Sequence, residues 1–214
     1  MDYELLRIIL SFCFLIPLII FDIKQRSAPF VYFIGFTILV AILYFLDLTP
    51  LYALILSPLY FVIWRAGIFG GGDMFTLSIL SMLLGGQLSI GLGIFLNALL
   101  LSTSIIGVNF IRNMIYYRQN KMLFSDLSSI TMKDKLIACC LGYRAKNPKN
   151  TFLMQVDGAL AFKMKHAEQE QFTDKKDVWV FSTIPFMVFI FVGFLAELFY
   201  GNILFLFVNL KLSL

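Results

Sequence analysis

Long apolar runs separated by short polar or glycine-rich stretches dominate the chain up to residue 110. A helix needs about 20 mostly apolar residues to cross a lipid bilayer, so these runs predict transmembrane helices. We predict six crossings, with the approximate bounds 5–21, 30–46, 51–64, 73–84, 88–110 and 178–198. A last apolar piece at 203–208 is too short to span a bilayer and is interpreted as an interfacial or packed tail.

One long polar stretch, 111–177, separates the fifth predicted helix from the sixth. The pattern therefore predicts an all-α, polytopic membrane protein with about six transmembrane helices and one cytoplasmic insert. We expect three parts: a five-helix membrane region at 1–110, a basic insert at 111–177, and a sixth helix with an apolar tail at 178–214.

The composition strengthens the membrane interpretation. Hydrophobic residues make up 60% of the chain and charged residues 14%, whereas a soluble globular domain carries about 25% charge. The chain has three cysteines, no C-x-x-C pair and a single histidine. This set argues against a zinc site and a disulfide framework, and no cofactor is predicted.

The positive residues predict the orientation. Twelve of the 17 Lys and Arg residues lie between Arg112 and Lys176. If six helices alternate, Lys24, Arg26 and Arg65 fall on the same side as this cluster. Cytoplasmic loops are enriched in Lys and Arg. We therefore expect a plasma-membrane protein with both termini outside, and we interpret the basic cluster as an orientation signal, not as a nucleic-acid site.

An isolated carboxylate is the first candidate for chemistry. Between Pro50 and Phe110 the only charged residues are Arg65 and Asp73. An ionisable residue is costly inside a membrane and by default indicates a functional site. Gly70, Gly71 and Gly72 directly precede Asp73. We interpret them as a substrate-binding backbone loop, because glycine permits positive φ and close approach of an extended chain.

Helix parity supplies a partner for Asp73. Asp22 follows the first predicted helix and Asp73 starts the fourth, so an even number of crossings returns the chain to the same face. Two neighbouring carboxylates at low dielectric cannot both ionise cheaply, so one keeps a proton and the other acts as a base. Such a pair can activate water for attack on a peptide carbonyl. Which aspartate is base and which is acid stays open.

Two motifs resemble a known family. Gly70-Gly71-Gly72-Asp73 is similar to the GxGD motif of the prepilin peptidase-like aspartic proteases, and Phe21-Asp22-Ile23-Lys24 is similar to their first aspartate motif. Within this family the chain most resembles the archaeal preflagellin (prearchaellin) peptidases. The resemblance implies that Asp22 and Asp73 are the catalytic pair. It also implies cleavage of the short basic class III signal peptide from preflagellins or type IV pilin-like precursors at the cytoplasmic face.

The chain departs from the family pattern at defined places. Phe75 stands two positions after the second aspartate, where the family often has lysine. Bacterial members carry a cysteine-rich cytoplasmic segment and methylate their product; this segment is missing, so we predict no methyltransferase activity. The Pro-Ala-Leu motif of presenilin-like proteases is also missing.

Two other functions use the same residues. One is a proton- or cation-coupled transporter or channel; the other is an inactive assembly scaffold. The sequence has no internal repeat and places the carboxylates at a membrane edge, which argues against a transporter. The insert is interpreted as a subdomain or a segment held on anionic lipid. Alternatively, its late acids help to receive the basic leader of the substrate; these are Glu168, Glu170, Asp174 and Asp177.

Overall fold

The computed structural model describes the following residues: 3–25, 28–46, 55–66, 70–84, 88–120, 123–125, 131–148, 151, 154, 175–181 and 186–203. They divide into two compact units, which are described separately. Unit 1 comprises Met1–Ser102 and Pro185–Leu214, and unit 2 comprises Thr103–Ile184. Unit 2 contains the whole predicted insert 111–177 and extends beyond it at both ends.

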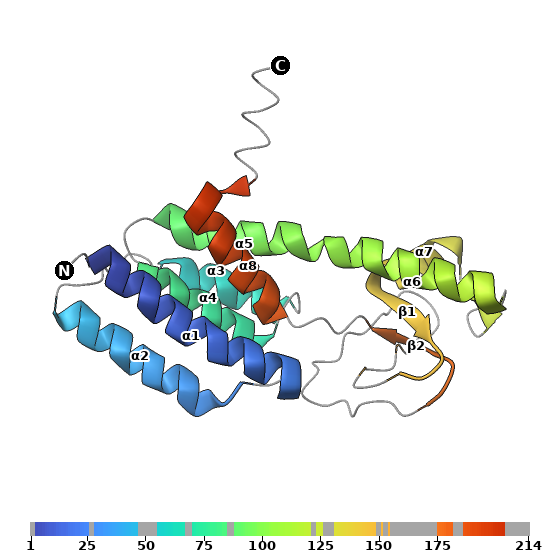
Figure 1. Cartoon of the computed structure of the whole chain (residues 1–214), viewed down its shortest axis with the longest axis horizontal. Coiled ribbons are helices and arrows are strands. Elements are labelled where there is room, and N and C mark those ends of the chain that lie inside the picture. Colours follow the sequence, from blue (N-terminus) through green and yellow to red (C-terminus); the bar gives the residue numbers. More distant parts are fainter. Residues whose placement is uncertain are drawn as a thin grey trace, which may run out of the picture. The chain divides into compact units, whose positions relative to one another are not determined.

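Unit 1 is helical in its described part (Figure 1). Its helices are α1 (Tyr3–Gln25), α2 (Phe30–Phe45), α3 (Leu56–Arg65), α4 (Gly71–Leu84), α5 (Leu88–Ser102) and α8 (Phe186–Tyr200). The start of α2 follows from Pro29, which is extended and precedes the first helical residue. Proline has no N–H to give, so it is tolerated where the helix has no acceptor for that group.

The helix α4 lies at the centre of unit 1, where it packs against α1, α2, α3, α5 and α8. It is buried on nearly every side from Thr76 to Leu84. Its core residues include Leu77, Leu80 and Leu83, each at most 1% exposed. A helix that is apolar all round belongs in a core, and this position fixes its first turn, including Asp73, among the surrounding helices.

Tyrosine hydroxyl groups join neighbouring helices of unit 1. Tyr32 of α2 donates its phenol O–H to the carbonyl oxygen of Cys13 on α1 at 2.8 Å. Tyr60 of α3 donates to the carbonyl oxygen of Gly91 on α5 at 3.1 Å, and its Oη lies 3.2 Å from Oγ of Ser81 on α4. Tyr60 is fully buried. Polar groups between helices are therefore satisfied by one another instead of by water.

The helices α5 and α8 approach closely through small residues. A Cβ atom on Gly193 would lie 2.8 Å from the Ile94 carbonyl oxygen and 2.9 Å from the Ala98 amide nitrogen. Asn97 donates its Nδ2 group to Glu197 Oε2 at 3.0 Å. Small residues that let backbones meet, together with interhelical hydrogen bonds, are typical of helix pairs packed in lipid.

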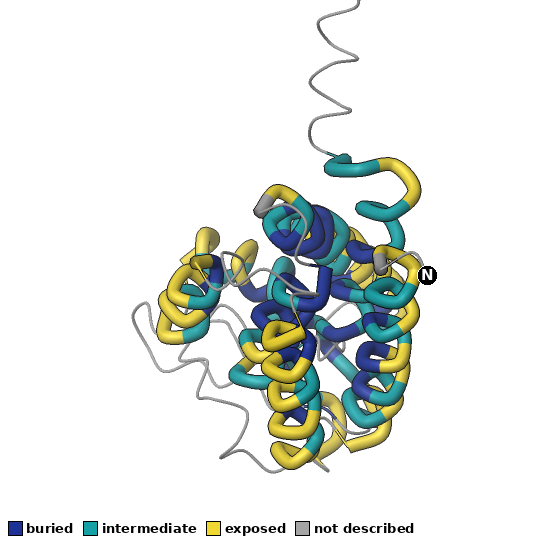
Figure 2. The backbone as a smooth tube through the Cα atoms, turned by 90° about the vertical axis from the view of Figure 1, so that its left-hand side faces the viewer, coloured by how far each residue is buried: buried dark blue, intermediate teal, exposed yellow. Residues whose placement is uncertain are grey.

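The outward faces of α1 and α2 are apolar. Exposed isoleucines recur every fourth residue on α2, at Ile34, Ile38 and Ile42, and α1 exposes Ile16 and Ile20. Figure 2 shows exposed positions along the outer sides of helices whose inner sides are buried. Two described helices, Glu4–Gln25 and Ser89–Asn120, are long and apolar enough to span a membrane. Phe30–Phe45, Gly71–Leu84 and Phe186–Tyr200 are shorter apolar helices.

Some predicted element bounds were wrong. The sixth helix was predicted from residue 178, but Val178–Phe181 forms strand β2 and α8 begins at Phe186. A short apolar run of branched and aromatic residues suits either structure, and strand pairing decides it. The predicted fifth helix 88–110 is α5 followed by α6 (Ser104–Asn120), so the first ten residues of the predicted insert are helical. Most of the predicted tail 203–208 lies outside the described residues.

Unit 2 contains a small sheet, so the prediction of an all-α chain holds only as a mainly helical one. Besides α6 it has α7 (Met132–Leu141), β1 (Gly142–Ala145) and β2 (Val178–Phe181). The strands are antiparallel, with Gly142 opposite Phe181 and Ala145 opposite Val178. A Cβ atom on Gly142 would overlap the Val180 carbonyl oxygen, so this pairing requires glycine there.

Two asparagines of α6 fasten the helix to this sheet and to α7. Asn109 donates Nδ2 to the Cys140 carbonyl oxygen at 2.9 Å. One turn later, Asn113 donates Nδ2 to the Gly142 carbonyl oxygen and accepts the Arg144 backbone N–H, both at 3.0 Å. Residues four apart share a helix face, so one face of α6 holds the end of α7 through Asn109 and the edge of β1 through Asn113.

Candidate active site

Asp22 lies in the last turn of α1 and is half-buried. Its Oδ2 accepts a hydrogen bond from the backbone N–H of Met187, the second residue of α8, at 3.2 Å. The first amides of a helix have no acceptor within the helix, and the helix dipole favours an anion at that end. The carboxylate of α1 therefore caps α8.

Asp73 is the third residue of α4 and is also half-buried. Its Oδ2 accepts the backbone N–H of Gly70 at 2.9 Å, and the Gly70 carbonyl oxygen accepts the first helical N–H, that of Met74, at 3.2 Å. This is one half of a capping box, in which an acidic side chain at the third position turns back to the N-cap amide. The side chain is thereby held at the start of α4.

The two aspartates belong to one site. The carboxyl groups of Asp22 and Asp73 are close enough to interact electrostatically. Met187 connects their surroundings: its amide bonds Asp22, and its sulfur accepts the Thr76 hydroxyl of α4 at 3.4 Å. Met187 and Thr76 are both buried. The ends of α1, α4 and α8 therefore meet, and both carboxylates lie at helix N-termini where a negative charge is favoured.

Two of the three glycines lie in a helix and not in the loop that the sequence predicted, while Gly70 lies just before the helix and the substrate-binding role stays a prediction. Gly71 and Gly72 are the first two residues of α4. Among the described glycines only Gly201 has positive φ. A Cβ atom on Gly71 would lie 3.5 Å from Trp64 Nε1, and one on Gly72 would lie 3.5 Å from Met187 Cε. Both are ordinary van der Waals distances, so neither packing nor a positive φ requires glycine at these two positions.

An aromatic cluster borders the site. Phe75 packs against Phe30 and Phe33 of α2, with ring centroids 6.0 Å and 5.7 Å apart. Phe33 also lies near Gly72, 3.8 Å from where a Cβ atom would be. Phe75 is thus part of an apolar wall between α2 and α4, at the position where the resembled family often has lysine.

Sequence reasoning missed Met187, Thr76 and Phe33. A methionine, a threonine and a phenylalanine in apolar helices have no pattern that marks them, because their role comes only from the packing of α2, α4 and α8. The start of α8 was itself misplaced. No signal in the sequence could have put Met187 beside Asp22, since 165 positions separate them.

The site consists of two carboxylates, Asp22 at the end of α1 and Asp73 at the start of α4, with an apolar wall beside them. Among the residues that the structure describes, no three His, Cys, Asp or Glu side chains gather to hold a metal ion. Paired carboxylates can share one proton, so that one donates while the other accepts. This is an arrangement for acid–base chemistry.

No family model matches the chain, and no curated protein matches it.

Proposed function

We propose that this protein is a membrane-embedded aspartic endopeptidase. It removes the short basic class III signal peptide from preflagellin or type IV pilin-like precursors at the cytoplasmic face. The observation that carries the proposal is the meeting of the helix ends that bear Asp22 and Asp73: Met187 of α8 donates its amide to Asp22 and packs against Gly72, next to Asp73. The two carboxyl groups are near enough there to interact electrostatically. The resemblance of both aspartate motifs to those of the prepilin peptidase-like proteases supplies the substrate class.

In the proposed reaction the ionised aspartate takes a proton from water, and the water oxygen attacks the scissile carbonyl carbon. The protonated aspartate gives its proton to the carbonyl oxygen, which yields a tetrahedral diol. Collapse of the diol breaks the C–N bond: the leaving amine takes a proton from the carboxyl group that had accepted one, and the other aspartate, now ionised, takes a proton from a diol hydroxyl. The product acid is released and the pair returns to one ionised and one protonated carboxyl group. Aspartic proteases use this alternation of two carboxyl groups.

A lipid setting for the site is supported by the surface of unit 1. Its helices carry isoleucines outward, while Ser11, Thr76 and Asn97 are fully buried. In lipid, polar groups are satisfied within the helix bundle and apolar side chains face outward. Six crossings, with both termini outside and the aspartates facing the cytoplasm in the plasma membrane, are part of the proposal.

The test is cleavage of a precursor in membranes. A preflagellin or pilin-like precursor is mixed with membranes that contain the parent protein, Asp22→Asn or Asp73→Asn, and its size shift is followed. Asparagine oxygen can still accept the Met187 or Gly70 amide, so the capping geometry is kept while the acid–base group is lost. We expect each variant to lose about 10³-fold or more in rate, as when a catalytic group is removed.

Glu197→Gln is the matched control, because it also neutralises a half-buried carboxylate of unit 1. It lies ten residues along α8 from Met187, about 15 Å away along the helix axis. We expect its rate to stay within about twofold of the parent rate. Equal cleavage by folded Asp→Asn variants would end the proposal. A parent that cuts neither precursor class, yet moves protons or cations, would favour the transporter.

A further inference from the structure

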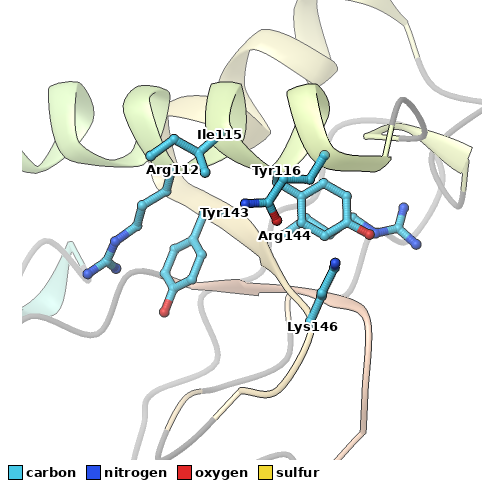
Figure 3. A pocket seen from close by; sticks show the side chains of 7 residues that line it. Arg112, Ile115, Tyr116, Tyr143, Arg144 and Lys146 are labelled. Atoms are coloured by element: carbon cyan, nitrogen blue, oxygen red, sulfur yellow. The ribbon is translucent and has the colours of Figure 1, made fainter.

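A basic hollow in unit 2 has no part in the proposed peptidase chemistry. Its volume is about 320 Å³. It lies between one face of α6 and strand β1 with the bend after it, and it is lined by Arg112, Ile115, Tyr116, Gln119, Tyr143, Arg144 and Lys146. The four α6 residues follow a spacing of three and four, so they share one helix face. Figure 3 shows Arg112 beside Tyr143, with Lys146 at the other side of the hollow.

Arg144 lies in the wall of the hollow, and its hydrogen bonds hold unit 2 together. Its guanidinium has five N–H donors, and described acceptors engage all of them. Nε and Nη2 bond the Asp177 carboxylate at 3.2 Å and 3.1 Å, and Nη2 also bonds the Asp177 carbonyl oxygen at 3.3 Å. Nη1 bonds the Leu123 carbonyl oxygen at 3.2 Å and Ser125 Oγ at 2.8 Å. Arg144 therefore has no donor left for a ligand.

Arg112 and Lys146 are the cations that remain for a ligand. The Arg112 guanidinium carbon lies 4.6 Å from the Tyr143 ring centroid, a cation–π contact that orients the group without using its N–H donors. Both side chains are exposed, and neither makes an ion pair with any carboxylate in the described part of the chain. Among the described residues, three cations and the Asp177 carboxylate give the hollow two net positive charges, which favour an anion as a ligand.

Apolar surface next to the hollow indicates which kind of anion. Ile115 lines it, and Ile111, one turn before Ile115 on α6, is also more than half exposed. A free anion such as phosphate gains nothing from these groups. An anionic lipid has both a phosphate and hydrocarbon, and basic groups beside exposed apolar residues are typical of segments that bind at a membrane surface.

We propose that this hollow binds the phosphodiester head group of an anionic phospholipid. Arg112 and Lys146 contact the phosphate oxygens, and Ile115 contacts the adjoining carbon atoms. The ring of Tyr143 holds the Arg112 guanidinium in place. Arginine suits this role because its planar fork matches two phosphate oxygens.

The test uses the full chain in detergent, titrated with dioctanoyl phosphatidylglycerol, and the bound lipid is counted by native mass spectrometry. Dioctanoyl phosphatidylcholine, glycerol 3-phosphate and inorganic phosphate are separate arms. We expect phosphatidylglycerol to bind about tenfold more tightly than phosphatidylcholine, and the double variant Arg112→Gln, Lys146→Gln to lose about tenfold in affinity. Arg112→Lys, which keeps the charge but loses the fork, should lose part of this affinity.

Arg118→Gln is the matched control, since it removes one exposed charge from the same helix without lining the hollow. We expect it to change affinity by less than about twofold. An equal loss in Arg118→Gln and Arg112→Gln would overturn the site in favour of general attraction. Unchanged affinity in the double variant would also overturn it. Phosphate binding as tightly as phosphatidylglycerol, with the same sensitivity, would replace the lipid by a free phosphate ligand.

Discussion

The Asp22 carboxylate accepts the backbone N–H of Met187 at 3.2 Å, across 165 positions of sequence. One bond thus joins the end of α1 to the start of α8. Met187 in turn packs against Gly72 and accepts the Thr76 hydroxyl, both on the helix that carries Asp73. The position of each candidate catalytic aspartate therefore depends on a helix that contains neither of them.

Replacing Asp22 should loosen the start of α8. We expect Asp22→Ala to lower the free energy of unfolding of unit 1 by about 1 kcal/mol, as for loss of a helix cap. Asp22→Asn keeps an oxygen acceptor and should lose only a small part of this. Hydrogen exchange at the Met187 amide and thermal unfolding in detergent measure the effect. Equal exchange in the alanine variant and the parent would contradict the capping role.

The close contact between α5 and α8 predicts that an added methyl group destabilises the protein at Gly193 but not at Gly35. In Gly193→Ala the new Cβ atom would meet the backbone of Ile94 and Ala98 below 3.0 Å, so the helices must separate. We expect a loss of about 1–3 kcal/mol in unfolding free energy. Gly35→Ala makes the same change on α2 with nothing within 4 Å. It should be neutral or stabilising by up to about 1 kcal/mol. Thermal unfolding of both variants measures the two changes in unfolding free energy.

Acid should weaken unit 2 through Asp177. Hydrogen bonds from Arg144 and then Tyr116 hold the pKa of the Asp177 carboxyl below its usual range. The ionised form is therefore favoured in the folded state, and this stabilisation is present above the unfolded pKa of about 3.9. It is lost as the pH falls through the lower folded pKa. Acidification below about pH 4 should thus destabilise unit 2.

Asp177→Asn tests this pH dependence. Asp177 has φ of 57°, a left-handed conformation that asparagine also adopts, so the backbone is preserved. At pH 7 we expect a loss of about 1–2 kcal/mol, because the Arg144 side chain is 5% exposed but that of Asp177 is 50% exposed to water. The loss of stability that Asp177 causes on acidification should be absent in this variant. Unfolding is followed by the fluorescence of Trp179 in a Trp64→Phe background, and an unchanged acid profile would refute the assignment.

The proposed orientation is tested by thiol labelling in intact cells. Cysteines are placed singly at Ser27, Ser89 and Ser128 in a chain whose Cys13, Cys139 and Cys140 are replaced. We expect an impermeant reagent to label position 89 from outside and to label positions 27 and 128 only after permeabilisation. Labelling of position 128 from outside would reverse the orientation and put the aspartates on the wrong face for a cytoplasmic substrate.

The candidate pair was accessible from the sequence because charge is rare in this region. Asp73 stands out between Pro50 and Phe110, and helix parity alone brings Asp22 to its face. The geometry that supports the pair was not accessible. Helix capping by Asp22 depends on where α8 begins, and the apolar run around residue 180 gave no sign that Val178–Phe181 pairs with Gly142–Ala145. The helical start of Gly71 and Gly72 was missed for a related reason, because glycine is compatible with several conformations.

By itself the sequence indicated the apolar helices and singled out the two aspartates, because continuous apolar runs favour buried or membrane-spanning helices and a charge among them is costly. The sequence also showed the basic cluster, but it did not show which of its cations are already bonded within the protein. Only the tertiary structure separated Arg144, whose donors bind Asp177, Leu123 and Ser125, from Arg112 and Lys146, which line the hollow. It also brought the ends of α1, α4 and α8 together, because long-range packing and hydrogen bonds choose partners that local pattern cannot specify.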